Sequence, residues 1–79
     1  DTFGAFLSDC TIKADGETER ASKLHAAYQL WNGNNNGQYQ MALNIFSSRL
    51  QERGYMKKRT NKETLYLGLS LKPKAEADF

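Results

Sequence analysis

The apolar residues of the N-terminal half fall into two stretches with helical spacing. The first stretch predicts a helix from residue 3 that buries Phe3, Phe6, Leu7 and Cys10. The second predicts a helix whose apolar stripe is Leu24, Ala27, Tyr28 and Trp31. Ser22 is its predicted N-cap, because a serine hydroxyl accepts a bond from a free N–H of the first turn. Asn32-Gly33 is its predicted end, since glycine tolerates the left-handed conformation of a helix stop.

Polar segments separate these elements. Asp15-Gly16 predicts a turn, and residues 18–21 form a possible short strand before the second helix. Residues 32–38, NGNNNGQ, contain no apolar residue and predict a solvated loop.

A third helix is predicted over residues 42–53. Leu43, Phe46 and Leu50 fall on one side when each residue is placed about 100° from the last, and Gly54 is the expected stop. The opposite side is polar and carries Asn44, Ser48, Gln51 and Glu52, with Ile45 and Arg49 on the flank.

The C-terminal part predicts a β-hairpin over residues 55–71. Leu65, Leu67, Leu69 and Leu71 alternate with Tyr66, Gly68, Ser70 and Lys72, which is typical of a strand with its leucines buried. Residues 55–59 form the partner strand, and residues 60–63 form the turn. The last seven residues, 73–79, show no pattern and are expected to be a frayed tail.

This order of elements predicts an α+β fold, a winged helix-turn-helix domain over residues 1–72 with three helices and a C-terminal hairpin as the wing. Composition agrees with one small globular domain, because the 79 residues are 39% hydrophobic and 25% charged.

No run of apolar residues approaches the roughly 20 that a membrane span requires. The missing secretory signal and the single cysteine favour a cytoplasmic protein. The missing initiator Met suggests a domain of a longer polypeptide.

The net charge of +2 conceals an uneven distribution. Residues 1–48 have a net charge of −2, residues 49–72 a net charge of +5, and the tail a net charge of −1. The basic part coincides with the third helix and the hairpin, which is typical of a nucleic-acid-binding surface. A solvated edge strand protected by lysines is the alternative for the hairpin.

In helix-turn-helix proteins the second helix of the motif enters the major groove of duplex DNA. Here that helix is 42–53, and the wing over residues 55–66 would meet phosphates of the backbone. The predicted DNA-binding residues are Ser22, Lys23, Asn44, Ser48, Arg49, Gln51, Lys57, Lys58, Arg59, Asn61 and Lys62. Glu52 and Glu63 lie near this surface and would oppose phosphate.

Other chemistry has few candidates. His25 is a lone histidine beside a core stripe, and Cys10 resembles a small core hydrophobe. The acids of Asp15 to Glu19 lack the remaining ligands of a calcium loop. No nucleophile–base set, phosphate loop or paired catalytic carboxylates can be assembled, so we expect neither an enzyme, a metal nor a cofactor.

Three motifs carry a family resemblance over about residues 3–72. The chain resembles the C-terminal winged-helix domain of the primase–helicase replication proteins of phages, plasmids and large DNA viruses. The matching positions are Ser22, Leu24, Ala27, Tyr28 and Trp31, then Phe46, Leu50, Arg53, Gly54 and Tyr55, then Tyr66, Gly68, Leu69 and Leu71. The resemblance implies a DNA-binding appendage that follows a ring-forming ATPase, whose own motifs are not in this sequence.

Two functions follow as expectations. The first is a DNA-binding module of a replication protein, with duplex DNA as its partner and no membrane. The second is a protein-interaction winged helix that docks a neighbouring subunit or a replication partner through the flank around Ile45 or the edge of the hairpin.

Overall fold

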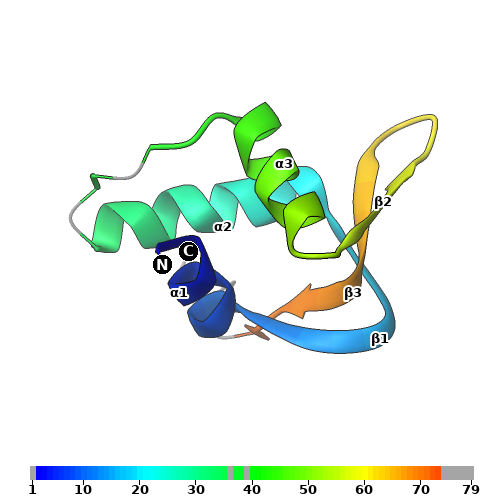
Figure 1. Ribbon diagram of the computed structural model, residues 1–79, viewed down its shortest axis with the longest axis horizontal. Coiled ribbons are helices and arrows are strands. Elements are labelled where there is room, and N and C mark those ends of the chain that lie inside the picture. The colour runs from blue at the N-terminus through cyan, green and yellow to red at the C-terminus, as the bar shows by residue number, and fades with distance from the viewer. Residues whose placement is uncertain (1, 36, 39, 74–79) are drawn as a thin grey trace.

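A computed structural model describes residues 2–35, 37–38 and 40–73 of the protein. The elements follow the chain in the order α1 (Thr2–Cys10), β1 (Thr11–Arg20), α2 (Ala21–Asn34), α3 (Leu43–Glu52), β2 (Met56–Arg59) and β3 (Thr64–Leu71). Figure 1 shows the β2–β3 hairpin at the opposite end of the molecule from the connection between α2 and α3. The predicted α+β class, with three helices and a C-terminal hairpin, is confirmed.

The three strands form one antiparallel sheet in the order β1-β3-β2. The hairpin turn closes where expected, over residues 60–63. The Thr60 hydroxyl accepts bonds from the N–H groups of Lys62 at 3.3 Å and Glu63 at 3.1 Å, and donates to the Glu63 carbonyl at 3.0 Å. These bonds hold the turn in one shape, so the hairpin presents its strands in a fixed orientation.

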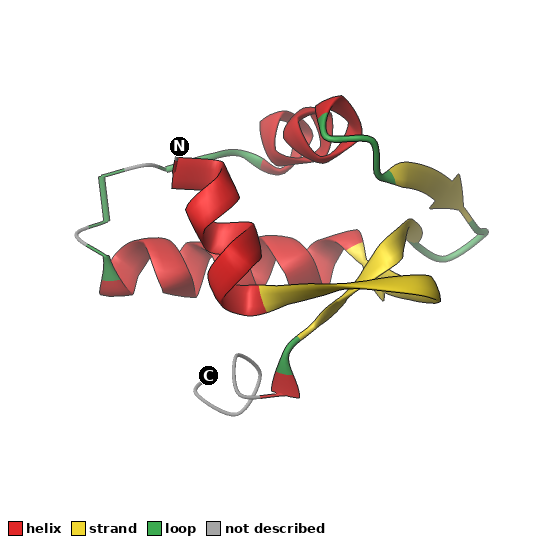
Figure 2. Cartoon of the chain, turned by 60° about the horizontal axis from the view of Figure 1, so that its bottom comes forward, coloured by secondary structure: helices red, strands yellow, loops and turns green. Residues whose placement is uncertain are grey.

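The core lies between the helices and the sheet and is rich in aromatic rings. α1 crosses α2 in Figure 2, and the Phe6 and Tyr28 rings meet edge to face with centroids 5.2 Å apart. Phe3 meets Phe46 of α3 in the same way at 5.4 Å. The apolar stripe predicted for α1 is confirmed, because all four of its members are buried: Phe3, Phe6, Leu7 and Cys10. Burial in this core raises the pKa of the Cys10 thiol, and the nearby Asp9 charge raises it further.

The prediction for the segment between α1 and α2 is confirmed in part. The short strand expected near residues 18–21 is present, because residues 18–20 pair with residues 65–67 of β3. It belongs to a longer strand, β1, over residues 11–20, and Asp15-Gly16 lies within this strand rather than forming the predicted turn. β1 pairs with β3 in two stretches, and the register shifts between Lys13 and Thr18. Gly16 has φ +84° and Gly68 on the facing strand has φ +92°, so both strands bend at this irregularity and pairing resumes beyond it.

The same irregularity overturns half of the predicted alternation along β3. Leu69 and Leu71 are buried as expected. Before the bend the inward and outward residues are the reverse of those predicted: Tyr66 is fully buried, and Leu67 is 37% exposed. Gly68 separates the two halves, and its positive φ reverses which residues face the helices.

The predicted helix boundaries of α2 need correction. The N-cap is Arg20 rather than Ser22, and among the described residues no side chain caps the first turn. The helix continues past Gly33 to Asn34, so the predicted loop 32–38 begins as helix. Asn32 is buried, and its carbonyl accepts bonds from the N–H groups of Asn35 and Gly37. Residue 36 lies outside the described residues.

The third helix is close to its prediction. It spans Leu43–Glu52, with Ala42 and Arg53 as the caps, and Gly54 follows it as expected. Phe46 and Leu50 are fully buried, but Leu43 is 44% exposed, contrary to the predicted inward position. Residues 74–79 of the predicted tail lie outside the described residues. In the part of the chain that is described, no helix has both the length and the apolar character that crossing a membrane requires.

Candidate nucleic-acid interface

The outward face of α3 is a polar stripe. At about 100° per residue, Asn44, Ser47, Ser48 and Gln51 lie within an arc of about 100°, on the side of the helix away from Phe46. The burial of Phe46 and Leu50 fixes this orientation, because those two side chains hold the opposite side of α3 against the core. The polar stripe therefore faces away from the core along the whole helix.

A groove of about 470 Å³ runs beside this stripe. One wall is α3, and the other combines the first residue of α2 with the hairpin. The lining residues are Ala21, Leu43, Asn44, Ser47, Ser48, Gln51, Lys57 and Thr64. The groove thus brings together four of the predicted DNA-binding residues from two elements: Asn44, Ser48, Gln51 and Lys57.

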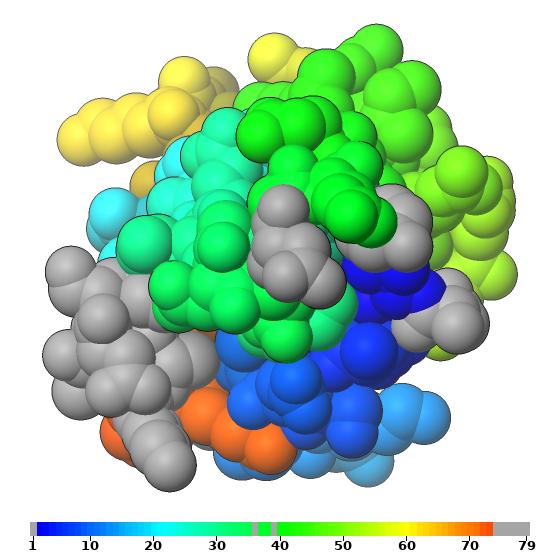
Figure 3. Space-filling model, turned by 90° about the vertical axis from the view of Figure 1, so that its left-hand side faces the viewer, coloured from blue at the N-terminus to red at the C-terminus, as the bar shows by residue number. Residues whose placement is uncertain are grey.

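The basic triplet of β2 is divided between the two faces of the sheet. Lys57 pairs with the buried Tyr66, and Arg59 pairs with Thr64, which lines the groove. Directly opposed residues of an antiparallel pair share a face, so Lys57 and Arg59 lie on the groove face. Lys58 pairs with Leu65 and belongs to the opposite face. The yellow segment around β2 projects beyond the body of the molecule in Figure 3.

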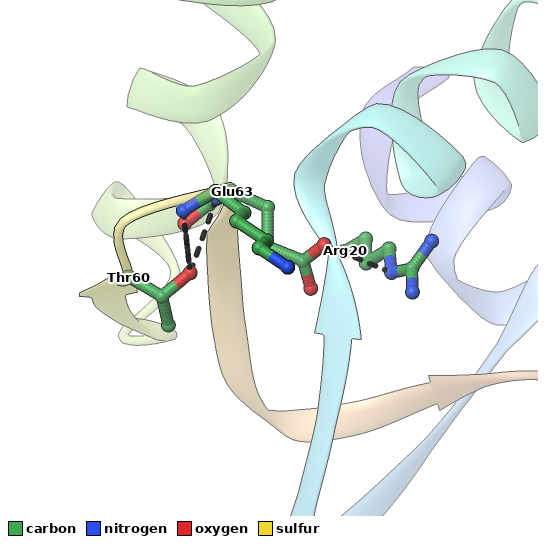
Figure 4. Close-up of polar contacts among 4 residues, drawn as sticks. Arg20, Thr60 and Glu63 are labelled. Carbon is green, nitrogen blue, oxygen red and sulfur yellow. Dashed lines mark hydrogen bonds and ion pairs between the residues drawn. The ribbon is translucent and has the colours of Figure 1, made fainter.

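The two acids near this surface are both paired. Arg20 Nε lies 3.2 Å from Glu63 Oε1, and this pair joins the start of α2 to the start of β3 (Figure 4). Arg49 Nη1 lies 3.4 Å from Glu52 Oε1, one turn along α3. Each acid therefore has its charge balanced locally, so the repulsion of phosphate expected from the sequence is reduced.

Arg49 is not brought to the groove. It lies about 100° round α3 from Ser48 and lines a second cavity, of about 270 Å³, on the other flank of the helix. Arg53 lines the same cavity, and its guanidinium carbon lies 5.5 Å from the centre of the Phe3 ring. The structure thus separates Arg49 and the C-cap Arg53 from the amide and hydroxyl side chains of α3.

The remaining predicted site residues are exposed around the groove without lining it. Ser22 and Lys23 lie in the first turn of α2, next to Ala21 of the groove wall. Asn61 and Lys62 lie in the hairpin turn. Within the described residues, the five cations Lys57, Lys58, Arg59, Lys62 and Lys13 make no ion pair.

His25 packs against the core. Its Nε2 lies 2.7 Å from the Met41 carbonyl oxygen, and its ring centre lies 5.4 Å from that of Phe46. The contact ties the segment before α3 to α2. No group of His, Cys, Asp and Glu able to hold a metal ion occurs in the described part of the chain.

Comparison with protein-family models, with curated proteins and with solved structures finds no match to this chain.

Sequence reasoning missed four residues of the groove: Ala21, Leu43, Ser47 and Thr64. Ser47 has a local signal, because it stands three residues after Asn44 and four before Gln51, on the same side of the helix. Leu43 has no such signal, because the sequence does not show whether an apolar residue at the first position of a helix faces the core or a groove. The place of Thr64 in the groove can be predicted only when the pairing of β2 with β3 is known.

Proposed function

We propose that this chain is a winged helix-turn-helix domain that binds duplex DNA, with α3 in the major groove and the β2–β3 hairpin as the wing on the phosphate backbone. The element order supports this architecture, because α2 and α3 are consecutive helices and the hairpin follows α3 directly. α3 turns its polar side chains outward, as a helix that reads DNA requires.

The groove between α3 and the hairpin carries the proposal. It joins side chains able to bond base edges, Asn44, Ser48 and Gln51, to a cation able to bond phosphate, Lys57. A DNA strand bordering the major groove would lie between the helix and the wing, with its bases toward α3 and its phosphates toward β2.

Charge supports the same orientation. The basic residues gather on the helix-plus-hairpin unit of residues 49–72, and both acids of that unit are paired with arginines. Of these basic residues, Lys57, Arg59 and Lys62 of the hairpin lie on or beside the groove face, so the hairpin supplies the positive potential where phosphates would lie.

A salt titration tests the proposal. Fluorescence anisotropy of a labelled duplex at several salt concentrations should give a falling log K against log salt, with a slope of about −3.6 for about four neutralised phosphates. A labelled single strand of the same length is the control for the duplex. A flat response would reject DNA binding.

The resemblance to replication proteins supports a place for the module beside a replication motor, with other subunits of that assembly as further partners. Most of the matched residues are buried, Tyr28, Phe46 and Tyr66 among them, so the resemblance rests on core packing. A test is whether the isolated domain, added in excess, competes with the parent protein for the same duplex.

A second function is favoured by exposed apolar side chains away from the groove. Met56 and Leu67 are opposed across β2 and β3 and are 70% and 37% exposed, and Ile45 on α3 is 46% exposed. These residues suit a protein–protein contact that tolerates salt. NMR shifts at Ile45, Leu67 or Leu30 on adding a partner, without shifts at residues 57–59, would support it.

A further inference from the structure

The side chains that line the α3 wall of the groove share one chemical character. They are two amides, two hydroxyls and one alkyl group: Asn44, Gln51, Ser47, Ser48 and Leu43. No guanidinium lines the groove among the described residues, because Arg49 lies toward Glu52 and the cavity on the other flank. The one cation of the lining, Lys57, comes from the hairpin wall.

This combination distinguishes the base pairs by their major-groove edges. Adenine presents one acceptor, N7, and one donor, the N6 amino group, which an Asn or Gln amide matches with its own donor and acceptor. Guanine presents two acceptors, which a guanidinium or ammonium matches better. Thymine adds a methyl group that an alkyl side chain can contact.

The amides are available for such pairing. No hydrogen bond involves the Asn44 side chain within the described residues, and the Gln51 amide nitrogen donates only a long bond, of 3.4 Å, to the Ser47 carbonyl. Asn44 and Gln51 are seven residues apart, which is about 10 Å along the helix axis. That distance corresponds to about three base-pair steps of 3.4 Å.

Resting on the proposed DNA binding, we infer that α3 reads A·T base pairs: Asn44 and Gln51 pair with the N6 and N7 positions of two adenines within about three base pairs, and Leu43 contacts a thymine methyl group. The preference for A·T pairs arises because amide and alkyl side chains line the α3 wall of the groove, whereas Arg49, which would favour guanine, lies outside it.

The first test is a selection from a duplex library with about ten randomised base pairs, one helical turn. We expect enrichment of adenines at a spacing of about three base pairs. A selected site rich in guanine, or no selected site despite DNA binding, would overturn the inference and leave the proposed function standing. Failure to bind any duplex would reject both.

The second test changes single atoms of the selected duplex. Replacing adenine by 7-deazaadenine removes the N7 acceptor and leaves the Watson–Crick pair, and should weaken binding about tenfold. Asn44→Ala or Gln51→Ala should weaken binding to the unmodified duplex by a similar factor and abolish the effect of the base at that position. Replacing thymine by uracil removes the methyl group and should weaken binding to the wild-type protein but not to Leu43→Ala.

Arg49→Ala is the matched control. It alters the same helix at an exposed position, and should leave the sequence preference and the response to 7-deazaadenine unchanged. Undiminished sensitivity to 7-deazaadenine in both amide variants, or loss of preference in Arg49→Ala, would overturn the assignment. The four substituted side chains are exposed, so each variant should fold and give the circular dichroism spectrum of the wild type.

Discussion

The division of the basic triplet gives a sharp test, because two neighbouring lysines differ in the face that they occupy. Lys57 lines the groove, whereas Lys58 belongs to the opposite face of the same strand. Lys57→Ala and Lys58→Ala remove the same charge from adjacent exposed positions. In the proposed complex only the first change removes a phosphate contact.

The magnitude follows from the number of cations placed around the groove. Lys57, Arg59, Lys62 and Lys23 can each neutralise one phosphate, so the wild type should show a slope of about −3.6. A fourfold rise in salt would then weaken its binding about 150-fold. With three contacts left, Lys57→Ala should show a slope of about −2.7 and a loss of only about 40-fold. Lys58→Ala should behave like the wild type.

Anisotropy titrations of the three proteins against one labelled duplex, at salt concentrations that span this range, measure the slopes directly. Both side chains are exposed, so each substitution should change stability by no more than about 0.5 kcal/mol. Equal slopes for the two variants would refute the assignment of faces from the strand register. A slope near zero for the wild type would refute DNA binding itself.

Three further predictions concern the fold. Phe6 is fully buried and meets Tyr28 edge to face, so Phe6→Ala should lower the free energy of unfolding by about 3–5 kcal/mol in urea denaturation, and a loss below 1 kcal/mol would contradict the core described here. Gly68→Ala should cost about 1–2 kcal/mol through its φ of +92° alone, because the added Cβ would meet Tyr55 Cδ1 at an ordinary 3.9 Å, and an unchanged urea midpoint would show that the bend is absent. Burial raises the pKa of the Cys10 thiol, so less thiolate exists near its usual pKa of about 8.5, and iodoacetamide should react more slowly with the folded protein than with the unfolded protein. The difference should narrow as the pH rises, and equal rates at all pH values would contradict the burial.

Local periodicity was sufficient to predict the helices. The four apolar residues of α1 recur at three- and four-residue intervals, and all four are buried, because the period of a helix is set by its own backbone. Phe46 and Leu50 follow the same logic. Leu43 does not, because at the first position of α3 it is 44% exposed and lines the groove.

The strands depend on partners distant in sequence, and here local patterns failed. Asp15-Gly16 has the composition of a tight turn, yet the pairing of β1 with β3 makes it part of a bent strand. The alternating leucines of β3 predict one continuous buried face, whereas the positive φ of Gly68 exchanges the faces between Leu67 and Leu69. Neither outcome can be derived without the opposite strand.

The candidate site shows the same contrast. The exposed positions of Asn44, Ser48 and Gln51 follow from the helix period. The place of Lys57 in the groove follows from its pairing with Tyr66, a residue that the leucine alternation had assigned to the outward face. The ion pair between Arg20 and Glu63 also joins residues 43 positions apart, which no local pattern indicates.

The central claim is that duplex DNA occupies the groove between α3 and the hairpin. An ¹H–¹⁵N NMR titration of the protein with a short duplex tests it most directly, because each backbone amide reports on its own surroundings. The account predicts the largest shifts at Asn44, Ser47, Ser48, Gln51 and Lys57, with smaller shifts at Lys58. Shifts confined to Leu30, Ile45 and Leu67, or no shifts at all, would contradict it.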